Sequence, residues 1–96
     1  MFLILLTYRV PLDQVDPHVA AHMTWLGEHY ASGKFLASGR KEPRSGGVIL
    51  ASVGTRAEAE ALAATDPLVT SGVAQCDVVE FLVSTAAPGL EMLKGR

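Results

Sequence analysis

The chain has 96 residues, a length that fits one domain with a single small core. Its 8 basic and 10 acidic residues give a formal net charge of −2, and no basic stripe marks a nucleic-acid surface, so we expect no nucleic-acid partner. Hydrophobic residues make up 49% of the chain, with a mean hydropathy of +0.28. Because this is apolar for so small a domain, we expect the excess surface to be buried in a homodimer or higher homo-oligomer.

The first predicted element is a strand at residues 2–9, which is apolar at nearly every position. This pattern is typical of a central strand that is covered on both faces. Helices can cover one face, and in so short a chain a second subunit would cover the other. The apolar run is too short to span a bilayer and lacks a basic leader, so we expect a cytoplasmic protein with no membrane partner.

A loop at residues 10–16 leads into a helix over 16–33, which is the best-marked element and carries all three histidines. Asp16 suits its cap, Pro17 its first turn and Gly33 its left-handed exit. One apolar stripe, expected to be buried, holds Val19, Met23, Leu26 and Tyr30. A second stripe lies about 100° around the helix, at the expected edge of the core, and holds His18, His22, Trp25 and His29.

The rest of the chain alternates strand and helix patterns between turn residues. We expect strands at 34–39 and 47–53, joined by a polar hairpin connection at 40–47. A helix at about 56–65 should follow, opened by the Thr55–Glu58 capping box. A loop of about one turn at 65–72 should then lead into a last strand at 73–83. The last strand carries polar residues that suit a sheet edge. The order βαββαβ predicts an α+β, ferredoxin-like domain over residues 1–83 with a C-terminal tail over 84–96. Two such sheets packed face to face would form a dimeric α+β barrel.

Three short motifs in this order resemble the YCII-related (YciI-like) domain. They are His22 in an AxHxxxL pattern, the strand end Ser38-Gly39, and Asp66-Pro67-Leu68 ahead of Gly72-Val73. The resemblance covers about residues 1–83 and implies a dimeric ferredoxin-like α+β barrel. It also implies that His22 and Asp66 form an active-site pair in a pocket near Ser38. The few enzymatic relatives suggest elimination or isomerisation of small ring compounds by acid–base steps.

The chain departs from the family pattern at two positions. Many members carry an arginine where this chain has Val19, and many carry a proline where it has Arg40. Either Arg40 supplies the missing cation or the ligand differs. Arg40 also belongs to a small basic cluster with Lys41 and Arg44, which suits either a carboxylate ligand or a solvated hairpin.

A histidine paired with an aspartate suits general acid–base catalysis, because the carboxylate fixes the imidazole tautomer and stabilises imidazolium. Asp66 could equally do no more than cap the turn that follows it. His18 and His22 have the spacing of a two-histidine metal site, but no HExxH motif completes it, so we expect no metal. His29 suits the surface or an interface. Trp25 could pack in the core or contact a ligand.

Together with the chemistry of the pair, the family resemblance implies a cofactor-free lyase or isomerase in which His22 moves a proton and Asp66 orients the imidazole. Its substrate would be a small anionic or aromatic metabolite. The predicted ligand contacts are Ser38, Gly39, Arg40 and Trp25. The alternative is a non-catalytic small-molecule binding or regulatory dimer that uses the same pocket.

Overall fold

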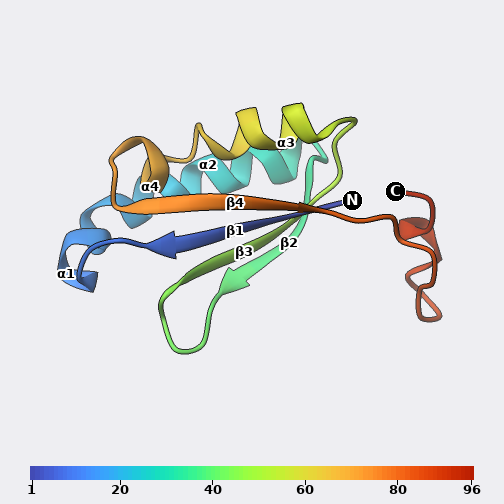
Figure 1. Ribbon diagram of the computed structural model, residues 1–96, viewed down its shortest axis with the longest axis horizontal. Helices are drawn as coiled ribbons and strands as arrows, with labels where there is room; N and C mark the ends of the chain where they lie inside the picture. The colour runs from blue at the N-terminus through green and yellow to red at the C-terminus, as the bar shows by residue number, and fades with distance from the viewer.

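The computed structural model describes all 96 residues and contains one antiparallel sheet in the order β2-β3-β1-β4 (Figure 1). Its strands are β1 (Phe2–Tyr8), β2 (Phe35–Arg40), β3 (Gly46–Ala51) and β4 (Ala74–Glu80). The helices are α1 (Leu12–Val15), α2 (Val19–Ala31), α3 (Arg56–Ala63) and α4 (Pro67–Thr70), with 3₁₀ turns at Asp16–His18 and Glu91–Leu93. The predicted central place of β1 and edge place of β4 are both confirmed.

The core lies between the sheet and the helices, which sit on one side of it (Figure 1). Alternate residues of β1, namely Phe2, Ile4 and Leu6, point to this side and are at most 2% exposed. Ile49 of β3 and Phe35 of β2 complete the same apolar layer. Period-two alternation thus decides which half of the apolar first strand faces the helices.

The other face of the sheet is also apolar, and no element of the chain covers it. Leu3 lies opposite Leu50 and Val79, and Leu5 lies opposite Val48. All five side chains are half-buried or exposed. The near-continuous hydrophobicity of the first strand therefore reflects two faces, of which the single chain buries only one.

Three local signals act as the sequence indicates. Thr55 caps α3 by accepting a hydrogen bond from the backbone N–H of Glu58 at 3.1 Å. Gly33 ends α2 with a φ of 81°, a left-handed conformation that glycine adopts without steric penalty. Residues 67–70 form the single turn expected in the loop after α3.

The start of the long helix differs from its prediction. Residues 12–15 form the short helix α1 in the expected loop, and Val15 is fully buried there. Asp16 opens a 3₁₀ turn and does not cap α2, because its carboxylate accepts a hydrogen bond from Arg44 at 2.7 Å. Burial of Val15 and this ion pair together override the expected cap.

The buried face of α2 is also rotated from the expected one. Met23 and Tyr30 are 58% and 39% exposed, whereas Trp25 is only 7% exposed. The indole N–H of Trp25 donates to the hydroxyl of Thr65 at 2.9 Å, so the ring can be buried with its polar atom satisfied. The core therefore takes Trp25 and Leu26, with Val19 packed against it, and leaves Met23 and Tyr30 outside.

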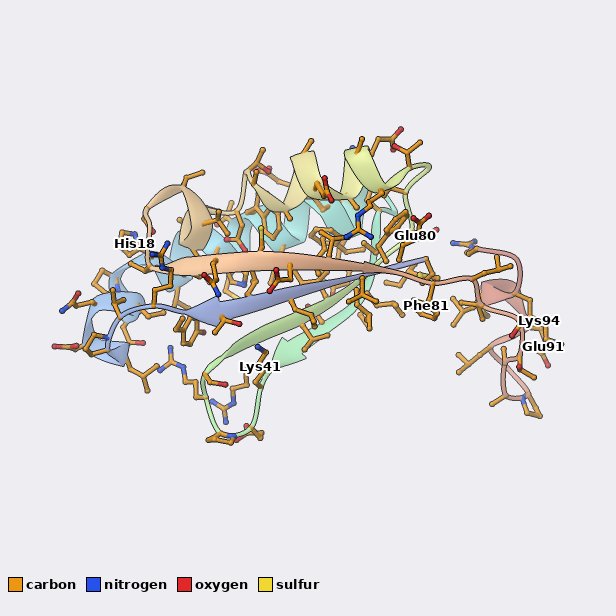
Figure 2. All side chains as sticks on the ribbon, in the orientation of Figure 1. His18, Lys41, Glu80, Phe81, Glu91 and Lys94 are labelled. Atoms are coloured by element: carbon orange, nitrogen blue, oxygen red, sulfur yellow. The ribbon has the colours of Figure 1, made fainter.

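Residues 84–96 extend beyond the end of the sheet as a separate tail (Figure 1). Its backbone closes on itself where Gly95 N–H donates to the carbonyl of Val83 at 2.9 Å. Figure 2 shows the Glu91 and Lys94 side chains on this tail, away from the sheet. No helix has the length and hydropathy that crossing a bilayer requires.

The closest backbone approach in the sheet generates a stability prediction. A Cβ at Gly46 would lie 1.8 Å from the carbonyl oxygen of Leu6, so Gly46→Ala should lower the free energy of unfolding by about 3 kcal/mol. The control Gly27→Ala adds a Cβ with no atom within 4 Å and should raise it by up to about 1 kcal/mol. Urea denaturation measures both, and equal effects would contradict the close approach.

Candidate active site

Two elements far apart in sequence bring His22 and Asp66 together. His22 lies on α2, and Asp66 stands at the junction of α3 and α4. The His22 Nδ1 atom lies 2.8 Å from Asp66 Oδ1 and 3.0 Å from Oδ2. Asp66 is fully buried, and the side chain of His22 is 14% exposed. The residues named from the sequence as a pair are thus in direct contact.

Asp66 also caps the turn that follows it. Its Oδ1 accepts a hydrogen bond from the backbone N–H of Leu68 at 2.9 Å, and Pro67 occupies the first position of α4. One carboxylate therefore both contacts His22 and caps α4. The cap fixes the side-chain rotamer of Asp66, and that rotamer presents the carboxylate to His22.

The contact assigns a role to each imidazole nitrogen. Nδ1 faces a carboxylate, so it carries the proton and donates. In neutral His22 the other nitrogen, Nε2, then has a free lone pair. Nε2 has no hydrogen-bond partner in the chain, and no fully buried side-chain nitrogen or oxygen is left without a partner. Nε2 is consequently accessible, which a general base requires.

Trp25 supports His22 from the core. Its ring stacks on the imidazole with centroids 5.8 Å apart and packs edge-on against Phe35. Trp25 is not among the residues that line the cavity beside His22, and its burial agrees with the packing alternative that the sequence offered. The reason is its hydrogen bond to Thr65, which draws the indole beneath the α3–α4 junction.

A cavity of about 340 Å³ lies between α2 and the β2–β3 hairpin. Its walls include His22 and the predicted ligand contacts Ser38, Gly39 and Arg40. Apolar side chains supply much of the remaining wall, namely Leu6, Val19, Leu26, Ile49 and Leu68. The volume and composition suit a small ligand with an apolar body.

Ser38 reaches this cavity because of its register. It lies opposite the buried Ile49, which places it on the helix side of β2. Its Oγ lies 2.6 Å from the hydroxyl of Tyr30 on α2, a hydrogen bond in which either group can donate. The predicted hydroxyl is therefore present together with a partner, Tyr30, that the sequence alone did not assign to the site.

The cationic side chains of the hairpin differ in their surroundings. Arg40 is 69% exposed and pairs with Glu42 at 2.9 Å. Arg44 also lines the cavity, is 31% exposed and pairs with Asp16. The hydrogen bond that Arg44 donates to the Asp16 carboxylate raises the pKa of Arg44 above its already high usual value. Arg44 and the cavity residue Tyr8 were missed as site residues, although Arg44 stood in the basic cluster of the sequence.

The remaining residues that the sequence suggested for chemistry do not belong to the His22–Asp66 pair. His29 is half-buried, and its ring packs against both Trp25 and Phe35. The structure contains no group of three or more His, Cys, Asp or Glu residues placed to hold a metal ion. Burial raises the pKa of the Cys76 thiol, and nearby Asp77 adds to the effect. Cys76 therefore stays a neutral thiol near pH 7.

The double role of Asp66 generates a stability prediction. Asp66→Ala should lower the free energy of unfolding by about 3 kcal/mol, because it removes a cap and leaves buried donors unpaired. Asp66→Asn keeps a capping oxygen, so its free energy of unfolding should fall less than that of Asp66→Ala. The control Asp16→Ala removes a more exposed ion pair and should lose at most about 1 kcal/mol. Chemical denaturation compares them, and a loss for Asp66→Ala no larger than the control would contradict the double role.

Comparison with solved structures finds a similar fold in 5-chloro-2-hydroxyhydroquinone dehydrochlorinase (TftG) from Burkholderia phenoliruptrix AC1100, in complex with 2,5-dihydroxybenzoquinone. The TM-score is 0.72 at 21% sequence identity, and the match covers 83% of this chain and 91% of that chain. The similarity confirms the predicted ferredoxin-like α+β fold. A comparison with curated proteins finds no match.

A comparison with protein families identifies the family of the chain. The family model of the YCII-related domain matches residues 1–82, which contain the whole sheet and all the helices from α1 to α4. The chain therefore belongs to the YCII-related domain family.

Proposed function

We propose that this protein is a cofactor-independent enzyme that moves a proton on a small ring compound. The observation that carries the proposal is the contact of His22, in the wall of the cavity, with the buried carboxylate of Asp66. A buried carboxylate beside an imidazole is the arrangement that orients a histidine base and stabilises its charged form. Ser38 and Arg40 would hold the substrate from the opposite wall.

The proposed reaction starts with Nε2 of His22 as the base. Nε2 takes a proton from an acidic C–H bond of the substrate, and Asp66 stabilises the imidazolium that results. The electron pair left on carbon either expels an anionic leaving group or accepts the proton back at another atom. The first outcome is an elimination and the second an isomerisation. In both, the hydroxyl of Ser38 donates to the substrate oxygen on which negative charge develops.

The similar solved structure supports the reaction class. Its name describes a dehydrochlorinase, which removes a proton and chloride, and its ligand is a small oxygenated ring. A ring of that size fits a cavity of about 340 Å³. The family membership and the cavity together therefore favour small-molecule processing over a purely structural role.

We further propose that the protein forms a homodimer through the open face of the sheet. Leu3, Leu5, Val48, Leu50 and Val79 form a contiguous apolar surface there. A second copy would bury this surface against itself about a twofold axis, with the two sheets packed face to face. Lys41 and Asp77 lie toward opposite edges of the sheet, where opposite charges of two copies could meet.

The enzyme proposal is tested by hydrogen exchange on 2,5-dihydroxybenzoquinone in D₂O, followed by loss of its ring-proton NMR signal. The wild-type protein should accelerate exchange, and His22→Gln should slow the catalysed rate by about 100-fold or more. His18→Gln is the matched control, since His18 lies one turn away outside the cavity, and it should exchange like wild type. Equal rates for wild type and His22→Gln would favour the non-catalytic binding dimer.

The dimer proposal is tested by light scattering at micromolar concentration. The wild-type protein should have the mass of two chains, because the open face is apolar. Leu5→Arg places a charge at the centre of that face and should give monomers. Ala61→Arg, on the exposed side of α3, should stay dimeric. A monomeric wild-type protein would remove the proposal.

A further inference from the structure

We infer that the ligand of the cavity carries one carboxylate group on a small apolar body, and that Arg44 binds this carboxylate. The inference rests on the proposed small-molecule function of the cavity and does not depend on catalysis. Its basis is the distribution of charge in the wall. Arg40 and Arg44 both line the cavity, and no aspartate or glutamate does.

The counter-charges of the two arginines lie outside the cavity lining. Asp16 pairs with Arg44 from the turn before α2, and Glu42 pairs with Arg40 within the hairpin. Neither carboxylate is part of the wall. The wall itself therefore holds two guanidinium groups and no carboxylate, a distribution that favours anionic over cationic ligands.

Arg44 is better suited than Arg40 to hold an anion. Its side chain is 31% exposed against 69% for Arg40, so an ion pair at Arg44 is less weakened by water. The contact of Arg44 Nη2 with Asp16 at 2.7 Å fixes the guanidinium plane before any ligand binds. Because arginine has five N–H donors, this contact leaves several of them for a second carboxylate.

The same contact positions the hairpin relative to the helix. Arg44 lies between β2 and β3, whereas Asp16 lies at the start of the 3₁₀ turn that leads into α2. The pair thus joins the two elements that carry Arg44 and His22. A ligand whose carboxylate is held by Arg44 has its apolar body against Leu6, Val19, Leu26, Ile49 and Leu68, on the wall shared with His22.

The test compares benzoate with its neutral analogue benzamide, using isothermal titration calorimetry on the full chain. Wild type should bind benzoate at least about tenfold more tightly than benzamide, because only benzoate forms an ion pair. Arg44→Gln should remove this difference by weakening benzoate alone. Arg44→Lys keeps the positive charge but cannot form the two parallel hydrogen bonds of a guanidinium. Its affinity for benzoate should therefore lie between those of wild type and Arg44→Gln.

The matched control is Arg56→Gln. Arg56 also pairs with a carboxylate, Glu60, at 2.9 Å, but it lies on α3 outside the cavity, so this variant should bind like wild type. Three results would overturn the inference. Wild type could bind benzoate and benzamide equally tightly, it could bind neither probe, or Arg44→Gln could bind benzoate as tightly as wild type does. His22→Gln should keep the preference for benzoate, which separates failure of this inference from failure of the catalytic proposal.

Discussion

The buried carboxylate of Asp66 is the constraint on which the rest of the site depends. An ionised group without exposure to water is strongly unfavourable unless donors surround it. Here the donors come from the backbone of α4 and from the imidazole of His22. The end of α3, the turn of α4 and the first turn of α2 must therefore meet at one point. The stability of the fold and the geometry of the site consequently depend on the same contacts.

Much of this arrangement could be predicted from the sequence because its signals are local. The uninterrupted apolar run of the first strand indicated a central position, and Thr55 and Gly33 marked helix ends by their backbone chemistry. The pairing of His22 with Asp66 came from a family resemblance, since nothing local connects residues 44 positions apart. The roles of these residues in catalysis stay predictions.

Other features could not be predicted because they depend on contacts across the fold. Periodicity favoured Met23 and Tyr30 as buried residues, but the hydrogen bond between Trp25 and Thr65 rotates the helix toward the indole. Likewise Asp16 suited a cap, yet Arg44 of the hairpin takes its carboxylate. In each case a polar partner distant in the sequence takes part, and a local pattern carries no information about such a partner.

The cavity joins two parts of the protein that tolerate mutation differently. One wall belongs to the core and holds His22, which the buried Asp66 supports from behind. The other wall is β2, an edge strand whose residues after Phe35 are all exposed. Replacing a residue of that strand changes the cavity but disturbs little packing. Relatives of this protein can therefore diverge in ligand preference along β2 and its hairpin while the histidine and aspartate stay in place, so a single scaffold can evolve toward many different small molecules.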